Sequence, residues 1–589
     1  MTRYRQRTHN NNNNKYNNST NNYHRQHLNS TDLDNQYSLN EENNKYFESE
    51  LNGYLFSFLH IDGINEFSFF PSQKINNFLF QQLIFSRLII LLFQCTINFV
   101  MRDGPTDAFK GINQPENNKG SSFDLFIYSI FGGLTTWDAR HFLHIAEFGY
   151  IWESSLAFFP LFPISLRILG GFLYLFIGNW FSLFSSMLIA GILLNNILFV
   201  INGMILFRLT LFLNGGNIKE AILAVYIHCW CPASIFYSSL YSESLYSTFT
   251  FLGLLLLYSP TTSQSRLNLL YASAIFSLAF LTRSNGLANI GFIGFYLLLD
   301  SIIFIGRQIP NENGGDGGGD KNEIQKYQQL EFREFSFDLI KRFFTNFLFG
   351  LLCFALMSIP LRVFEFSVHD KFCTLSNVQY NDLRIKNYFN SEEAIFREIV
   401  LPGELTKLEW CNESFSFTNN FLLPNYYQFI QQKYWDVGLF NYWKWQKLPL
   451  FLLAAPTLWI AIYGFIKQTF QLLSTDLRPI PEILIDRNSQ IPFACHILLL
   501  ALSGLFFYNV EVSIRLLYSS SPFLYLVLAR LINNQTLEQQ KIDDLLHSKV
   551  LPFLRDYMRK GFWPFLIFCY LFGYFIFGTM LHVNWLPFV

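Results

Sequence analysis

The sequence is poor in charge and lacks the motifs of several enzyme classes. Of its 589 residues, 14% are Asp, Glu, Lys or Arg, whereas soluble proteins average about 25%. The net charge of -1 provides no basic field for nucleic acid. No Walker loop, dinucleotide-binding glycine pattern or credible His-x-x-x-His helix occurs, and the eight cysteines show no zinc spacing. We therefore expect no nucleic-acid partner, no metal and no cofactor.

The beginning of the chain lacks an apolar face that could pack. Asn10 to Asn14 form an asparagine run, and Asn, Gln and Tyr dominate to about Asn44. Such low-complexity sequence is typical of disorder. It also lacks the apolar core of a signal peptide. We predict a disordered Asn-rich cytosolic tail over residues 1–75.

Most of the remaining chain is strongly apolar. Overall, 51% of the residues are hydrophobic and 68 are Phe, and runs near the length of a bilayer-spanning helix recur. This pattern predicts an all-α polytopic membrane protein. The candidate spans are 78–100, 184–213, 219–238, 243–259, 267–282, 286–306, 343–364, 448–466, 491–509, 515–531 and 562–583. The apolar segment 156–178 is broken by Pro160, Pro163 and Arg167, so it is either a further span or a re-entrant or interfacial piece.

Three loops carry clusters of Lys and Arg, namely 307–342, 467–490 and 532–561. The positive-inside rule places all three in the cytosol. If 156–178 does not span, all three fall on one side of the membrane. This parity predicts about eleven spans, a cytosolic linker at 307–342, a lumenal loop at 365–447 and a lumenal C-terminus.

The 365–447 loop contains two cysteines and a glycosylation sequon. A disulfide between Cys373 and Cys411 is compatible with an oxidising lumen, and two free thiols are the alternative. Asn412 begins the sequon Asn412-Glu413-Ser414, on the side of the membrane where glycosylation occurs.

The unusual polar residues share the lumenal face in this topology, which indicates an enzyme or transporter vestibule. Asp138 follows Trp137 in a short aromatic segment after the first span. Thr135 and Asp138 fit a capping box, so Asp138 has a structural interpretation as a helix-capping residue. The functional interpretation is a general base that takes a proton from a sugar hydroxyl.

Other residues near these lumenal ends also have two interpretations. His141 and His144 share a helix face with Asp138, and they either bind a phosphate or serve as interfacial aromatics. Arg283 and Arg515 either extend to lipid headgroups or bind a substrate phosphate through the guanidinium fork.

Two further clusters contain candidate donors and acceptors for a sugar. Asn285 lies beside Arg283 and adds a neutral donor. Glu243, close to Tyr241, either favours the dipole at a helix start or bonds sugar hydroxyls. Trp137 is a further candidate for contact with the sugar.

Several blocks, taken in order, resemble the PIG-V mannosyltransferase family of glycosylphosphatidylinositol (GPI) anchor assembly. They cover most of the chain from about residue 78. The similar blocks are Trp137-Asp138 with Ile145-Ala146 and Gly149-Tyr150, Phe158 to Pro163, Cys231 to Phe236, Leu240 to Ser244, Thr282 to Gly286, Tyr434 to Gly438, Leu452 to Pro456, Val510-Glu511-Val512 with Arg515, Ser521-Pro522 with Tyr525, and Leu581 to Pro587.

The resemblance implies a GT-C-type glycosyltransferase domain over 76–589 in the endoplasmic reticulum membrane, with its active site facing the lumen. The donor would be dolichol-phosphate-mannose and the acceptor a GPI precursor, joined by an inverting α-1,6 transfer. Asp138 would be the base, and Arg283, Arg515, His141 and His144 would bind the donor phosphate. A small membrane partner subunit is a further possibility.

Two alternatives to this function come from the same sequence. One is another lipid-linked-sugar glycosyltransferase of the same fold. The other is a polytopic lipid or sugar transporter, which is expected to show related halves with interrupted helices at matching positions. No such internal symmetry is evident.

Overall fold

The apolar segments fold into helices because, in lipid, a chain must satisfy its backbone hydrogen bonds within the segment itself. A computed structural model describes residues 73–112, 121–258, 266–308, 321–374, 382–412, 422–475, 490–533 and 561–588. All of these lie in one compact unit, residues 67–589. Helices are the regular elements throughout these ranges, and no strand occurs in them. The mostly helical fold is therefore as predicted, whereas the tail assigned to 1–75 lies almost entirely outside the described residues.

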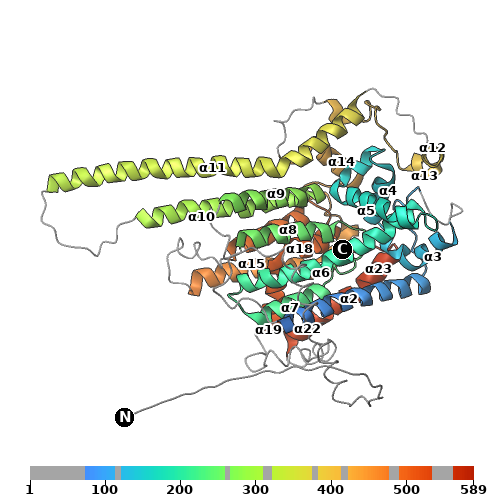
Figure 1. The fold of residues 1–589 in the computed structure, drawn as a ribbon, viewed down its shortest axis with the longest axis horizontal. Helices are drawn as coiled ribbons and strands as arrows, with labels where there is room; N and C mark the ends of the chain where they lie inside the picture. Colours follow the sequence, from blue (N-terminus) through green and yellow to red (C-terminus); the bar gives the residue numbers. More distant parts are fainter. Residues whose placement is uncertain are drawn as a thin grey trace, which may run out of the picture. The chain divides into compact units, whose positions relative to one another are not determined.

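The helices have the following bounds in chain order (Figure 1). They are α2 (Gln73–Val100), α3 (Ser122–Phe131), η1 (Gly132–Thr135), α4 (Asp138–Phe148), η2 (Glu153–Ala157), α5 (Leu161–Ile177), α6 (Leu183–Leu213), α7 (Ile218–Cys229), α8 (Glu243–Tyr258), α9 (Arg266–Thr282), η3 (Ser284–Asn289), α10 (Ile290–Gln308), α11 (Lys321–Cys373), α12 (Leu383–Phe389), α13 (Glu392–Phe396), η4 (Glu409–Asn412), α14 (Asn425–Trp435), η5 (Trp445–Lys447), α15 (Leu448–Thr475), α17 (Ile491–Phe506), η6 (Val510–Val512), α18 (Ser513–Ser520), α19 (Pro522–Asn533), α22 (Phe562–Gly573), η7 (Tyr574–Gly578) and α23 (Thr579–Val583).

Six helical stretches of the described chain are long and apolar enough to cross a membrane, or seven if the bent pair at 510–533 counts as one span. The predicted number of eleven is not reached by this criterion. Helices α7, α8, α9 and α17 are too short, with 12 to 17 residues. The chain is a multi-pass membrane protein by these helices, and the number eleven stays a prediction.

Three predicted segments differ from the structure. The span 219–238 ends as a helix at Cys229, and turns follow around Pro232, whose ring disfavours a helical conformation in the preceding residue. The linker 307–342 is helical from Lys321, because α11 extends far beyond the apolar segment 343–364. The segment 156–178 contains a helix, α5, which packs against α6 and leaves Leu175 78% exposed.

The break after α7 is stabilised by a buried arginine on α2. Arg87 is 3% exposed. Its guanidinium donates to the backbone oxygens of Cys229 and Ser234 at 3.1 and 3.0 Å, and to the hydroxyl of Ser238 at 3.1 Å. These carbonyls lie at and after the end of a helix, where backbone acceptors lose their helical donors. Arg87 thus fixes the turns between α7 and α8.

A second break separates α18 from α19, whose axes differ by 85°. The freed carbonyls at the end of α18 find side-chain donors. Tyr237 and Tyr525 donate to the carbonyl of Tyr518 at 3.0 and 2.9 Å, and Ser247 donates to that of Ser519 at 2.7 Å. Both breaks therefore retain hydrogen-bonded backbones while they interrupt the helices.

The 365–447 segment is tied down at two points. Cys373 and Cys411 form a disulfide across 38 residues of sequence, which decides between the two alternatives that the sequence left open. The buried carboxylate of Glu153, in η2, accepts hydrogen bonds from the side chains of Trp410, Lys433 and Tyr434 at 2.9, 2.6 and 2.8 Å. These bonds hold the segment against the elements that follow α4.

Candidate active site

Asp138 is the first residue of α4, and its side chain does not cap the helix. Thr135, the expected capping partner, donates its hydroxyl to the carbonyl of Gly132 at 2.7 Å within η1. The N-cap residue is Trp137, which makes no side-chain capping bond. The capping-box interpretation of Asp138 is therefore wrong.

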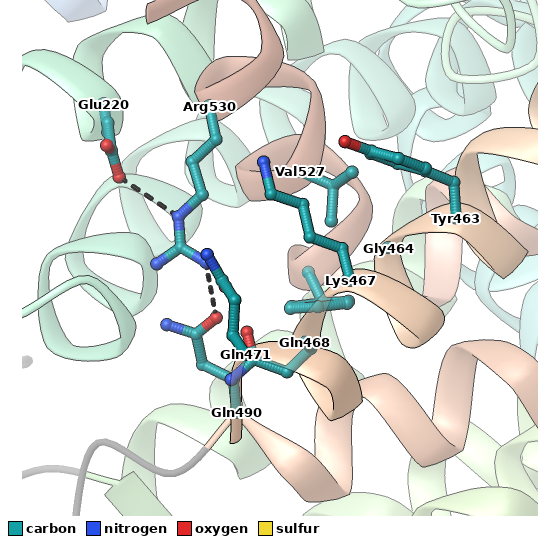
Figure 2. A pocket seen from close by; sticks show the side chains of 10 residues that line it. Glu220, Tyr463, Gly464, Lys467, Gln468, Gln471, Gln490, Val527 and Arg530 are labelled. Carbon is teal, nitrogen blue, oxygen red and sulfur yellow. Dashed lines mark hydrogen bonds and ion pairs between the residues drawn. The ribbon is translucent and has the colours of Figure 1, made fainter. Parts of the chain in front are cut away.

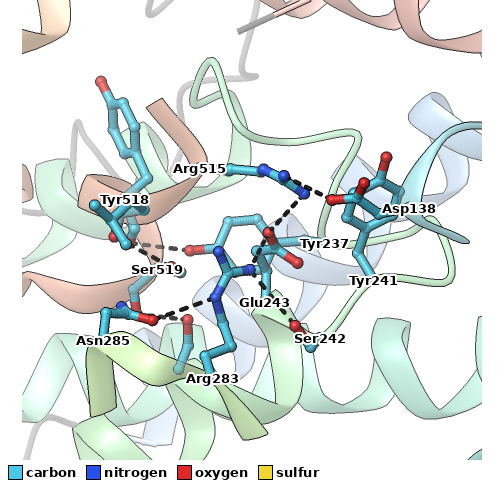
Figure 3. Close-up of polar contacts among 12 residues, drawn as sticks. Asp138, Tyr237, Tyr241, Ser242, Glu243, Arg283, Asn285, Arg515, Tyr518 and Ser519 are labelled. Atoms are coloured by element: carbon cyan, nitrogen blue, oxygen red, sulfur yellow. Dashed lines mark hydrogen bonds and ion pairs between the residues drawn. The ribbon is translucent and has the colours of Figure 1, made fainter. Parts of the chain in front are cut away.

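The carboxylate of Asp138 pairs with Arg515 of α18 (Figure 3). Arg515 donates from Nη2 to Oδ2 of Asp138 at 2.7 Å, and its Nη1 lies 3.5 Å from Oε1 of Glu243. The guanidinium carbon also lies 5.2 and 5.5 Å from the ring centroids of Tyr241 and Phe236. One cation thus joins two carboxylates from helices far apart in the sequence.

Arg283 binds the same glutamate from the other side. It forms an ion pair with Oε1 of Glu243, and its Nε donates to Oδ1 of Asn285 at 3.4 Å. Asn285 in turn donates to the hydroxyl of Ser520 at 2.9 Å. The structure therefore gathers five predicted site residues, Asp138, Glu243, Arg283, Asn285 and Arg515, into one cluster.

The two carboxylates of this cluster differ in access. The side chain of Asp138 is 30% exposed, whereas that of Glu243 is 0% exposed. Both residues begin a helix, where the helix dipole favours negative charge. Burial by itself raises the pKa of Asp138, but the charge and hydrogen bond of Arg515 outweigh it and lower that pKa below its usual range. Asp138 is therefore the ionised and partly exposed carboxylate of the cluster.

The two histidines of α4 lie in aromatic surroundings. The ring of His141 stacks on Phe158 with centroids 4.6 Å apart, and burial lowers the pKa of His141 to about 4, although Asp138 opposes this shift. His144 is 4% exposed and stacks on Trp152 at 4.0 Å. His141 thus borders the cluster as a neutral ring. His144 packs among the aromatic rings next to it.

Tyr241 and Trp137 lie next to the cluster. The hydroxyl of Tyr241 donates to the carbonyl of Thr136 at 3.4 Å, and the residue is 2% exposed. The ring of Trp137 contacts that of Trp585, with centroids 5.8 Å apart. All nine predicted site residues are described, and eight of them lie in or beside the cluster, with His144 set back among the rings.

The segment 579–588 also lies beside the cluster, and none of its residues is among the predicted site residues. Nε2 of His582 lies 3.2 Å from the hydroxyl of Thr136 and 3.1 Å from that of Ser239. The available sequence signal was His582, an ionisable residue within the predicted span 562–583, because such residues in a span are costly and usually functional.

A separate polar cavity of about 310 Å³ lies elsewhere (Figure 2). Its lining includes Arg530, Lys467 and Glu220. Arg530 donates to Oε1 of Gln490 at 2.8 Å and lies 3.5 Å from Glu220. These groups come from the beginning of α7 and the later parts of α15 and α19, away from the segments that carry Asp138 and Arg515. Because both basic and acidic side chains line the cavity, its charge does not indicate a class of ligand.

A protein-family match and several similar proteins all indicate the same family for this chain. The family described as Mannosyltransferase (PIG-V) matches residues 75–307 and 326–589. The chain is 28% identical to GPI mannosyltransferase pigv-1 of Caenorhabditis elegans, over 88% of this chain and 81% of that protein. It is 30% identical to GPI mannosyltransferase 2 of Drosophila melanogaster, over 75% and 88% of the two chains. It is 26% identical to GPI alpha-1,6-mannosyltransferase 2 of Homo sapiens, over 76% and 82%.

Among solved structures, the chain is similar to the archaeal oligosaccharyltransferase AglB from Archaeoglobus fulgidus. The TM-score is 0.39 at 11% identity, and the match covers 85% of this chain and 56% of that one.

Proposed function

The chain belongs to the PIG-V mannosyltransferase family, and from this premise we propose its reaction and the residues that carry it. It is a glycosyltransferase that adds the second mannose, α-1,6-linked, to the GPI-anchor precursor. Its donor is dolichol-phosphate-mannose. The names of relatives that align over most of the chain support this activity.

Asp138 is the general base in this proposal. The observation that carries this role is the difference in access, because Asp138 alone of the two clustered carboxylates reaches exposed space. Arg515 holds Oδ2, so the other carboxylate oxygen is available to take the proton from the acceptor 6-hydroxyl. A base must be ionised before it acts, and the lowered pKa of Asp138 meets that requirement.

Arg283 and Arg515 stabilise the leaving group. As the acceptor oxygen bonds to the anomeric carbon, the bond from that carbon to the phosphate oxygen breaks, and the β-linked donor gives an α linkage. The departing dolichol phosphate then gains a negative charge. Fixed cations at that point stabilise the transition state more than the ground state. Both side chains are partly accessible, at 16 and 12% exposure, and each guanidinium has more donors than the cluster uses.

The remaining cluster residues orient these groups. Glu243 is fully buried between the two arginines, so it positions them. Asn285 fixes Arg283, and Tyr241 packs under Arg515. Trp137 and His141 border the accessible side of Asp138, where they suit contact with the sugar or the phosphate. His144 packs on Phe109, whose ring also contacts His141.

The location of this site follows from the topology that we propose. We infer a GT-C-type domain over 76–589, with eleven crossings of the endoplasmic reticulum membrane and the Asp138 cluster on the lumenal face. The Cys373–Cys411 disulfide supports an oxidising compartment for the 365–447 segment, and Asn412 is exposed there. The tail at 1–75 remains cytosolic in this scheme, and a small partner subunit belongs to the same proposal.

Acceptor sites for glycosylation test the topology. Loss of the gel shift on Asn412→Gln would place the modification at that residue. New sequons introduced into 307–342 and 532–561 should stay unmodified. Modification of either one contradicts the eleven-crossing scheme.

A transfer assay tests the reaction itself. Microsomes that lack the endogenous enzyme receive this protein and labelled dolichol-phosphate-mannose, and the anchor intermediates are separated by size. The expected result is conversion of the one-mannose intermediate into the two-mannose intermediate. Persistence of the one-mannose species with well-expressed protein contradicts the assignment.

A further inference from the structure

The segment 579–588, which includes α23, contacts the two residues directly before Asp138 and one of the rings beside the Arg515 guanidinium. We propose that this segment is a positioning clamp that holds the catalytic carboxylate in its reactive orientation. The inference rests on the proposed function of Asp138. Three independent sets of contacts carry it.

The first contact is polar, and it joins the residues before Asp138 to the turns that lead to Glu243. The hydroxyl of Thr136, two residues before Asp138, donates to the carbonyl of His582 at 2.9 Å and lies 3.2 Å from Nε2 of its ring. The same nitrogen lies 3.1 Å from the hydroxyl of Ser239, in the turns that lead to Glu243. The residue is 1% exposed, so water cannot replace these bonds.

The second contact joins two tryptophans in conformations that large side chains rarely adopt. Trp137 has φ 56° and ψ −126°, and the amide of Ala139 donates to the carbonyl of Thr136 at 3.2 Å. These values match the second residue of a type II′ turn, where Gly, Asn and Asp dominate. A non-glycine residue in this conformation is strained, and the conformation persists only where the surrounding structure enforces it.

Trp585 occupies the other unusual position. Its φ is 59°, and two backbone bonds follow α23, from Trp585 to the carbonyl of His582 at 3.4 Å and from Leu586 to that of Leu581 at 2.9 Å. This is a Schellman cap with Trp585 at the left-handed position, where Gly is usual. The rings of Trp137 and Trp585 touch, at 5.8 Å between centroids. Two strained residues therefore brace each other directly before Asp138.

The third contact lies under the arginine. Phe588 stacks on Phe236, with centroids 5.7 Å apart and planes within 7°. Phe236 is one of the two rings that support the Arg515 guanidinium. The segment also lies very close to η1, because a Cβ at Gly133 would come within 2.4 Å of Val583. The clamp therefore fixes the backbone before Asp138 and the support of its partner together.

The decisive variant is Trp585→Gly, with Phe440→Gly as the matched control. Glycine suits the cap of α23 better than tryptophan, but it removes the ring that braces Trp137. Phe440 also has a positive φ, 59°, and is 51% exposed in the 365–447 segment, so its replacement likewise exchanges an aromatic residue for glycine at a positive φ without removing the contact with Trp137. We expect kcat of Trp585→Gly to fall by about 10- to 100-fold, since a misplacement of ~1 Å costs about that much. KM for the donor should change little, and Trp585→Phe should recover most of kcat.

A second pair of variants covers the case in which the cavity left by Trp585→Gly lowers protein abundance. His582→Phe keeps a ring of similar size and loses the contacts that the ring nitrogen makes with the hydroxyls of Thr136 and Ser239, while the backbone carbonyl at 582 still accepts from Thr136. His582→Gln retains a side-chain donor. The proposal expects low kcat for the first and partial recovery for the second, at equal protein level.

The outcomes separate this proposal from the proposed function. Wild-type kcat in both Trp585→Gly and His582→Phe overturns the clamp while Asp138→Asn remains inactive. Equal loss in Phe440→Gly also overturns it, because the effect would then not depend on the contact with Trp137. An active Asp138→Asn instead removes Asp138 as the base.

Discussion

Replacement of Asp138 by Asn gives the sharpest test of the proposed base. The amide keeps the size of the side chain and can still accept a hydrogen bond from Arg515, but it cannot take a proton from the acceptor hydroxyl. The capping alternative no longer competes, because Asp138 makes no capping contact. The remaining structural alternative is that Asp138 merely neutralises Arg515.

The structure sets the size of each effect. Asp138, Glu243, Arg283 and Arg515 carry two negative and two positive charges, and the variant leaves one positive charge in excess. A hydrogen bond to a charged group contributes about 1.5–3 kcal/mol, and Glu243 still lies 3.5 Å from Arg515, so we expect a loss of stability no greater than that. Loss of a general base lowers the rate by roughly 100- to 10,000-fold, which corresponds to about 3–5 kcal/mol in the activation free energy.

The assay is mannose transfer in microsomes that lack the endogenous enzyme, normalised to protein level. The variant should be nearly as abundant as the wild type and should accumulate the one-mannose intermediate. The double variant Asp138→Asn with Arg515→Gln restores the balance of charge but provides no base. If it transfers mannose, Asp138 acts only through its charge, and substantial transfer by well-expressed Asp138→Asn alone would refute the base assignment.

Three further experiments, with four variants, test the leaving-group site, the pKa of Asp138 and the disulfide. Arg283→Lys and Arg515→Lys should each lower transfer, by up to about 100-fold as for removal of a donor that stabilises developing charge; near-normal rates in both would favour contact with lipid headgroups. Arg515→Met removes the main influence that lowers the pKa of the Asp138 carboxyl, so its pKa should rise and the acid side of the pH–rate profile should move to higher pH, whereas an unchanged profile contradicts that coupling. Cys373→Ser with Cys411→Ser should destabilise the 365–447 segment by up to about 4 kcal/mol, because the disulfide closes a loop of 38 residues. Faster proteolysis within 382–412 would show this loss, and unchanged cleavage contradicts a stabilising disulfide.

The sequence predicted the composition of the site better than its geometry. Local chemistry marked Asp138, Arg283 and Arg515 as unusual beside a membrane, and all three lie in the cluster. Their pairing could not be predicted, because Asp138 and Arg515 are separated by 377 positions and no local pattern encodes that contact. The capping prediction failed because η1 uses the hydroxyl of Thr135 first.

Helix boundaries show the same limit. Apolar runs such as 184–213 were identified to within one residue of α6. The run 219–238 was not, because apolar composition continues through the turns after Cys229, where tertiary bonds from Arg87 replace helical ones. Hydropathy indicates which segments are apolar enough to lie in lipid. Where a helix breaks inside such a segment depends on hydrogen-bond donors from helices that are distant in the sequence.

The arginine of α2 has a consequence for how the protein is made. Arg87 emerges from the ribosome 142 residues before Cys229, one of its acceptors. At about 5–20 residues per second, that interval is on the order of ten seconds, and insertion of an unsatisfied arginine at the centre of a span costs about 2.5–3.5 kcal/mol. Nascent α2 should therefore integrate incompletely until α7 and its following turns are synthesised. Nascent chains arrested before and after residue 240 should differ in carbonate extraction, and Arg87→Leu should abolish that difference. The order of membrane assembly would then depend on one guanidinium, whose backbone acceptors are synthesised later than the helix that carries it.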